Sequence, residues 1–338
     1  MVKAFVSGCS GLELTDDELG FFAEAQPWGL ILFRRNVASR AQLQGLAARF
    51  RDAVGRPDAP VLVDQEGGRV QRLAPPHWPA YPAGAAYARM AATRGAEAAW
   101  LGGRLIAQDL EEAGLTIDCA PVLDLPVPGG TAAIGDRGLG TSPEAVAQLG
   151  RAFADGLLAG GILPVFKHVP GHGRALADSH YELPVVKADR AALETDFEPF
   201  RRLADLPIGM TAHVVYTAID SERPATTSPI VIDRIIRGTI GFQGLLLSDD
   251  LSMQALQGSL GERAAAAIAA GCDIALHCNG KLDEARQVAA AVPLLAGAAE
   301  QRASQALGRR SDPQHLDVRS SRARLAMLMQ DGASDAVA

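Results

Sequence analysis

The chain has 338 residues, and its 32 lysines and arginines against 39 aspartates and glutamates give a formal charge of −7. Hydrophobic residues make up 48% of it, as expected of a chain that folds around a packed core. The mild acidity excludes the basic stripe that nucleic-acid binding needs. No apolar stretch approaches the ~18 residues of a membrane span, and the N-terminus has no signal-peptide core. Four scattered cysteines without a CxxC motif indicate a reducing compartment, so we expect a cytoplasmic protein.

Eight short apolar runs recur along the chain and predict strands. They are Lys3–Val6, Gly29–Phe33, Pro60–Val63, Leu115–Ala120, Gly161–Lys167, Leu206–Ala212, Gly244–Ser248 and Gly271–His277. Runs that are apolar at successive positions are typical of parallel strands buried on both faces.

Segments with helical periodicity lie between most of these runs. They are Arg40–Val54, Ala96–Ala113, Ser142–Ala159, Arg190–Leu203, Ser228–Thr239 and Leu260–Ala270. Ser39, Ser142 and Ser228 are predicted N-terminal caps, and glycines such as Gly55 and Gly271 follow the predicted C-termini.

Eight alternating units predict an α/β fold, a single TIM-type (β/α)8 barrel over residues 1–310. An open doubly wound sheet is the alternative, but no strand is followed by the GxGxxG turn that usually marks its ligand site. Residues 311–338 are more polar and form a predicted C-terminal appendage with a helix at Val318–Met329.

The active site of such a barrel lies at the carboxyl ends of its strands. Asp249 follows a run of three leucines, so its carboxylate is predicted to project rigidly into the barrel mouth, as a nucleophile requires. The alternative is that Asp249 or its neighbour Asp250 only caps the following helix. Two adjacent carboxylates favour a division of roles, one inward and one capping.

The segment after the fifth run combines a turn-rich loop with three histidines. Asp178 stands two residues before His180, where a carboxylate can orient an imidazole and raise its basicity for proton transfer. The alternative is a metal site, because His168 and His172 have i,i+4 spacing, with His180, His213 and Asp249 as further donors. Pro170 and Gly171 break the helix that such ligation usually needs, so we expect no metal and no other cofactor.

Four further charged residues follow strands or lie on nearby loops: Asp64, Arg72, Arg137 and Lys167. One carboxylate and three cations at one mouth suit a hydroxyl-rich ligand, since a carboxylate accepts from sugar hydroxyls and lysine or arginine donates to them. The alternative interpretation is ion pairing around the rim of the barrel.

Three motifs resemble glycoside hydrolase family 3, specifically its bacterial single-domain β-N-acetylglucosaminidases of cell-wall recycling. They are Asp64–Arg72, Lys167–Gly173 with Asp178–His180, and Ser248–Met253. The resemblance implies a retaining exo-hydrolase that removes terminal β-linked N-acetylglucosamine, with Asp249 as nucleophile, His180 as acid/base and Asp178 assisting it.

The same resemblance implies that the sugar is bound by Asp64, Arg72, Arg137 and the Lys167–His168 pair. The implied partner is a small carbohydrate, an N-acetylglucosamine-containing muropeptide, rather than a nucleic acid or membrane, and we expect a monomer. Because Gly171 and Gly173 lie in its loop, His180 is predicted to swing in when substrate binds.

Three alternatives stay open at this point. A metal-dependent hydrolase would use the loop histidines, and a sugar-binding barrel would bind without turnover. Phosphate could replace water as the acceptor, because a loop histidine would not repel it as a carboxylate acid would.

Overall fold

The computed structural model describes residues 1–90, 92–130, 132–179 and 182–335. Eight parallel strands close into a barrel in the order β1-β12-β11-β9-β7-β6-β3-β2. Their bounds are β1 Lys3–Gly8, β2 Pro27–Leu32, β3 Val61–Val63, β6 Ile117–Asp118, β7 Leu163–Val169, β9 Ile208–Thr211, β11 Leu245–Asp250 and β12 Ile274–His277. Each overlaps one of the eight predicted runs, so the (β/α)8 barrel is confirmed.

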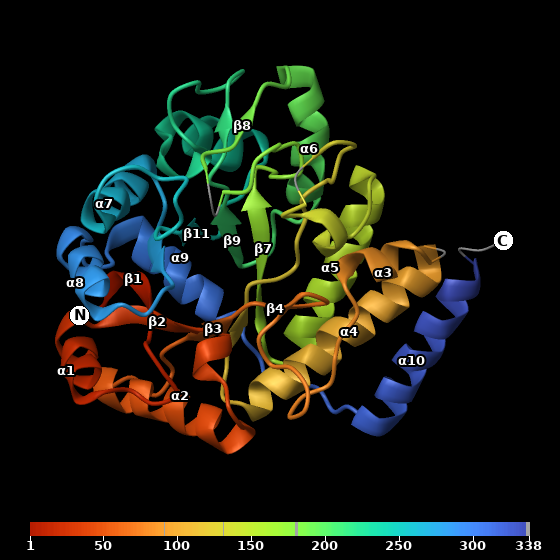
Figure 1. Ribbon diagram of the computed structural model, residues 1–338, viewed down its shortest axis with the longest axis horizontal. Coiled ribbons are helices and arrows are strands. Elements are labelled where there is room, and N and C mark those ends of the chain that lie inside the picture. Colours follow the sequence, from red (N-terminus) through yellow and green to blue (C-terminus); the bar gives the residue numbers. More distant parts are fainter. Residues whose placement is uncertain (91, 131, 180–181, 336–338) are drawn as a thin grey trace.

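Helices surround the barrel (Figure 1). They are α1 Asp16–Ala25, α2 Arg40–Val54, α3 Gly84–Ala88, α4 Ala92–Glu112, α5 Pro143–Ala159, α6 Arg190–Arg202, the π-helix η4 Val231–Thr239, α7 Leu260–Ala270, α8 Leu282–Ala291, α9 Gly297–Leu307 and α10 Val318–Asp335. The hydroxyls of Ser39, Ser142 and Ser228 each accept from a backbone N–H three residues on, which confirms the three predicted caps. The segment after Ser228 differs from prediction in being a π-helix.

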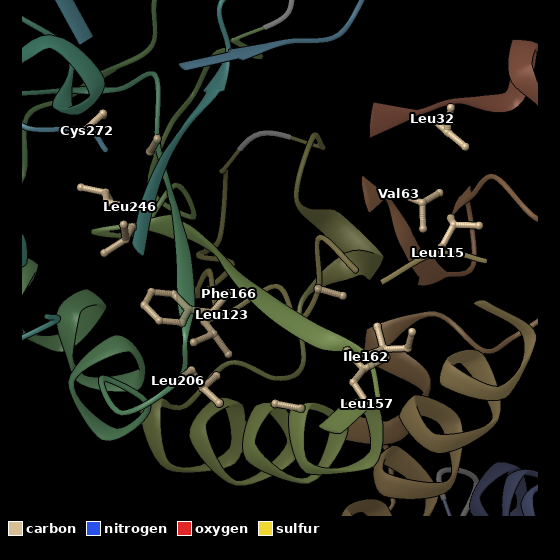
Figure 2. Close-up of a cluster of buried hydrophobic side chains, with 14 of the residues drawn as sticks. Leu32, Val63, Leu115, Leu123, Leu157, Ile162, Phe166, Leu206, Leu246 and Cys272 are labelled. Atoms are coloured by element: carbon tan, nitrogen blue, oxygen red, sulfur yellow. The ribbon is translucent and has the colours of Figure 1, made fainter. Parts of the chain in front are cut away.

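Side chains alternate between two layers along each strand because successive residues of a strand point to opposite faces. On β7, Leu163 and Val165 point into the barrel interior, whereas Phe166 packs outward. Figure 2 shows the outer layer, in which Phe166 lies near Leu123 and Leu206, and Leu157 of α5 lies beside Ile162. This alternation also decides which polar side chains enter the mouth.

The last helix, α10, lies along α4 on the outside of the barrel (Figure 1). Arg322 pairs with the buried Asp109 at 3.3 Å, and Arg324 forms an exposed pair with Glu97 at 2.7 Å. The predicted tail helix is therefore present, while the division of the chain at residue 310 stays a prediction. Within the described ranges, no helix is long and apolar enough to cross a membrane.

Candidate active site

A cavity of about 260 Å³ opens at the carboxyl ends of the barrel strands. The floor of the cavity is formed by the next inward-facing residue of several strands. In each case this residue stands two positions beyond the last apolar inward-facing residue, and side chains two positions apart on a strand point to the same side. These residues are Phe33, Asp64, Lys167, Asp249 and Cys278. Period-two alternation thus brings charged side chains from three strands into one small cavity.

Five of the charged groups form a chain of ion pairs across the floor. Lys167 Nζ lies 2.8 Å from Asp64 Oδ1 and 2.7 Å from Glu66 Oε1. Asp64 also accepts from Arg72 at 3.0 Å, and Glu66 accepts two hydrogen bonds of 2.8 Å from Arg137. The predicted residues Asp64, Arg72, Arg137 and Lys167 are therefore brought together, and Glu66 joins them.

Burial and pairing act in opposite directions on these groups. Burial alone would raise the pKa of Asp64, but Lys167 and Arg72 outweigh it and hold that pKa well below its usual range. Burial alone would lower the pKa of Lys167, but the nearby carboxylates of Asp64 and Glu66 raise it above the ordinary lysine value. All members are therefore charged at neutral pH, and each holds its neighbours in place.

A small hairpin presents Glu66 and Arg72. It pairs β4 (Gln65–Gly67) with β5 (Val70–Gln71), and the Gln65 side chain accepts from the backbone N–H of Arg72 at 2.9 Å. Gly67 has a φ of 91°, and a Cβ there would lie 2.2 Å from the carbonyl oxygen of Pro82. Only glycine fits this turn, so the hairpin conformation and the placement of Arg72 depend on it.

His168 lines the cavity, and its ring is hydrogen-bonded to the buried Asp124. Its Nδ1 lies 2.6 Å from Asp124 Oδ2. Burial would raise the pKa of Asp124, but His168 and His172 keep it below its usual range, so the carboxylate is ionised and accepts. Nδ1 therefore carries the proton, and Nε2 is the ring nitrogen left for a ligand.

The two adjacent carboxylates at the end of β11 divide their roles. Asp249 lines the cavity, and its Oδ1 accepts from the backbone N–H of Asp250 at 2.8 Å. The Asp250 carboxylate accepts from the N–H groups of Ser252 at 3.0 Å and Cys278 at 3.1 Å, so it caps a turn rather than a helix. Burial would raise the pKa of Asp249, but His168, His213 and the Asp250 N–H hold it below the ordinary value, which leaves an ionised carboxylate.

The loop after β7 places Asp178 and Ser179 on the wall of the cavity, while the predicted acid/base, His180, lies outside the described residues. Ser179 is buried, and its hydroxyl lies 3.4 Å from His172 Nε2. Position 173 requires glycine, because a Cβ there would lie 1.8 Å from the Leu125 carbonyl oxygen. The predicted swing of His180 stays a prediction.

The proposed metal donors do not gather among the described residues. No group of three or more histidine, cysteine, aspartate or glutamate side chains there has the arrangement of a metal site. His168 Nδ1 is engaged with Asp124, and His213 bonds through both ring nitrogens to Thr226 and Asp250.

Two residues of the site, Glu66 and Asp124, carry a sequence signal but are not among the predicted site residues. Glu66 belongs to the first motif and stands two residues after Asp64, yet its role depends on Arg137, 71 residues away. Asp124 follows the fourth apolar run, so a strand-end inventory that included that run would have found it.

The sequence and fold place the chain in a known family of enzymes. Residues 14–309 match the model of the glycosyl hydrolase family 3 N terminal domain, and the chain belongs to this family. This membership confirms the predicted enzyme class.

Individual relatives are similar over most of their length. A Beta-hexosaminidase of Alkalilimnicola ehrlichii is 43% identical over 287 residues, covering 82% of this chain and 81% of its own, and one of Methylococcus capsulatus is 41% identical over 80% of each chain. The crystal structure of native NagZ from Neisseria gonorrhoeae superposes with a TM-score of 0.86 at 32% identity, covering 97% of this chain and 98% of its own. The same protein in complex with N-trifluoroacetyl-D-glucosamine gives 0.86 at 33% identity, with 97% of each chain covered.

Proposed function

We propose that this enzyme removes terminal non-reducing β-linked N-acetylglucosamine from peptidoglycan fragments, with retention of configuration. The observation that carries the proposal is the ionised Asp249 carboxylate, which enters a small charged cavity from a barrel strand. The Beta-hexosaminidase relatives and the neighbour that binds an N-acyl-glucosamine support the choice of sugar.

Asp249 is the nucleophile of this mechanism. Its carboxylate oxygen forms a bond to the anomeric carbon as the glycosidic bond breaks, giving a glycosyl-enzyme that water then hydrolyses. The backbone N–H of Asp250, 2.8 Å from Oδ1, fixes the orientation of the carboxylate. The low pKa supports this role, because the attacking group must be deprotonated.

The proton for the leaving oxygen comes from His180 in this proposal, and Asp178 stabilises its imidazolium form. That Asp178 lines the cavity supports this assignment. After it has donated its proton the imidazole is neutral, and so it avoids the repulsion that a second ionised carboxylate would meet next to Asp249. In the second step His180 accepts a proton from the water that attacks the glycosyl-enzyme.

The ion-paired floor binds the sugar. Asp64 accepts hydrogen bonds from ring hydroxyls, while Arg72, Arg137, Lys167 and His168 Nε2 supply the remaining contacts. Because each charge has a partner 2.7 to 3.0 Å away, little reorganisation is needed when the ligand enters. Such a preorganised floor suits one terminal sugar rather than a long chain.

Water is the favoured acceptor over phosphate. The three cations Lys167, Arg72 and Arg137 each pair with Asp64 or Glu66, and the ionised Asp249 supplies the third negative charge, so these groups together carry no net positive charge for a phosphate dianion. The proposal places the reaction in the cytoplasm and treats the enzyme as a monomer.

The test is Asp249→Asn assayed on an aryl β-N-acetylglucosaminide. We expect kcat to fall by more than about 10⁴-fold while the fold is retained. With the unaltered enzyme, a muropeptide substrate should release free N-acetylglucosamine at the same rate with and without phosphate. Substantial activity of Asp249→Asn would contradict the nucleophile assignment, and a sugar phosphate product would contradict hydrolysis.

A further inference from the structure

His213 contacts β11, the strand that carries Asp249, but is not among the described residues that line the cavity. It lies two residues after β9 and is fully buried. Its Nε2 lies 2.9 Å from the carbonyl oxygen of Asp250, and its Nδ1 lies 2.7 Å from the hydroxyl of Thr226. The ring therefore bridges the 3-10 turn η3 (Ala225–Thr227) and the end of β11.

The two partners determine where the ring proton is. A backbone carbonyl can only accept, so Nε2 must donate to Asp250. Burial lowers the pKa of His213, against the opposing pull of Asp249 and Asp250, so the ring is neutral near pH 7. A neutral ring with its proton on Nε2 has a lone pair on Nδ1, and that lone pair needs a donor.

Thr226 is the donor. Its single hydroxyl proton has three acceptors within reach, His213 Nδ1 at 2.7 Å, the Thr211 hydroxyl at 2.8 Å and the Ala212 carbonyl at 3.1 Å. The shortest contact is to Nδ1, whose lone pair has no other donor within the described contacts. The Thr226 oxygen then accepts from the hydroxyl of Thr211, 2.8 Å away. The resulting chain runs in one direction, from Thr211 through Thr226 and His213 to Asp250.

Asp250 is the residue through which this chain acts on the nucleophile. Its N–H holds Asp249 Oδ1, and its carboxylate is held by Ser252 and Cys278. Its carbonyl is held by His213. Displacing that carbonyl would rotate the backbone from which Asp249 enters the cavity.

We propose that His213, kept in its Nε2–H tautomer by Thr226, is a positioning residue that fixes the backbone supporting Asp249. This inference rests on the proposed role of Asp249 as nucleophile. His213 does not itself touch the sugar. It acts by holding the carboxylate in the attack geometry, in which a displacement of about 1 Å can reduce the rate by about 100-fold.

The first test changes Thr226, which touches neither substrate nor Asp249. Thr226→Val keeps the shape but removes the donor to Nδ1, and Thr226→Ser keeps the donor. We expect Thr226→Val to lower kcat by about tenfold with KM within about twofold of the parent, and Thr226→Ser to stay within about threefold. If Thr226→Val lowers only the melting temperature and leaves kcat unchanged, the inference is wrong.

A second measurement reads the tautomer directly and does not depend on activity. In protein labelled with ¹⁵N-histidine, the His213 resonances are identified by their loss in His213→Gln. They should show a neutral ring with the proton on Nε2 at pH 7, and Thr226→Val should shift the Nδ1 resonance. A His213 proton on Nδ1 in the parent would overturn the assignment even if Thr226→Val failed to fold.

The two proposals fail in different ways. If Asp249→Asn remains active, the nucleophile assignment fails, and the proposed role of His213 fails with it because Asp249 is then not the catalytic group. If Asp249→Asn is inactive while Thr226→Val matches Thr226→Ser in kcat, only the role of His213 fails.

Discussion

The floor of the cavity and the loop that forms its wall are held in different ways. The five charged groups that form the chain of ion pairs in the floor each have an oppositely charged partner, as Lys167 has in Asp64 and Glu66. On the wall loop the contacts of Ser179 are longer: its hydroxyl lies 3.4 Å from His172 Nε2, and its carbonyl accepts from the Ala255 N–H at 3.3 Å, although Arg174 anchors the same loop to Asp196 at 2.6 Å.

This difference matches the two tasks of the site. Binding groups that must be preorganised lie on rigid strands, where removal of one charge leaves its partner buried and unpaired. A loop that has to admit and release a substrate is held by contacts that cost little to open. Substitutions in the floor should therefore have larger effects than substitutions in the wall.

Removal of the charge that links Lys167 and Arg137 should have the largest effect. Glu66→Gln leaves both Lys167 and Arg137 without a full counter-charge in a buried site, so we expect kcat/KM to fall by about 100-fold and stability by about 3 kcal/mol. The matched control is Glu97→Gln, which alters an equally bidentate but exposed pair with Arg324. Kinetics and urea unfolding of both variants provide the measurement, and equal effects would contradict the special role of the floor.

The second largest effect should come from changing Asp124, the carboxylate that accepts from His168. Asp124→Asn offers an amide N–H to Nδ1, where the native carboxylate accepts, so the imidazole has to change tautomer or turn. We expect kcat/KM to fall by about tenfold, mainly through KM. Asp109→Asn is a control, because this carboxyl is also buried and paired with arginines but lies beside α10. A loss of stability in both variants with unchanged KM would show that Asp124 is only structural.

A change in the wall should be milder. Ser179→Ala removes the hydroxyl near His172 without disturbing the floor, and we expect kcat to fall by about two- to fivefold. Amide hydrogen exchange of residues 170–179 should increase, while exchange in the barrel strands stays the same. Unchanged loop exchange would remove the distinction between wall and floor.

The smallest effect on activity is expected at Asp196, where the change should appear only in the pH dependence of stability. Burial raises the pKa of Asp196 to about 6, and Arg174 only partly offsets this. Because this pKa lies above the value of about 4 in the unfolded chain, the contribution of the group is greatest below pH 4 and is lost as the pH rises through 6.

Asp196→Asn removes that titration. Between pH 4 and pH 7 the parent should lose on the order of 2 kcal/mol more stability than the variant. Urea unfolding at pH 4, 5, 6 and 7 measures the difference, with the exposed Asp58→Asn as control. Parallel curves for parent and Asp196→Asn would contradict the raised pKa.

The sequence predicted the barrel and much of the site because both follow from local patterns. Period-two alternation along β7 and β11 already implies that Lys167 and Asp249 follow their apolar inward neighbours into the mouth. Serine caps and glycine ends marked the predicted helices for the same local reason. The alternative of ion pairing at the rim was also partly right, because the four predicted sugar-binding charges pair within the cavity.

Local pattern could not identify the partners of these groups. Glu66 lies 71 residues from Arg137, Asp124 lies 44 from His168, and His213 lies 37 from the Asp250 carbonyl. Which of them meet depends on how the strands are staggered when the barrel closes.

The amino-acid sequence by itself therefore determined the strands, the helices and the charged residues that end the strands. The tertiary structure alone decided which charges neutralise one another and which ring nitrogen of His168 and His213 carries the proton. The physical reason is that pairing, burial and tautomer depend on neighbours in space, and those neighbours come from distant parts of the chain.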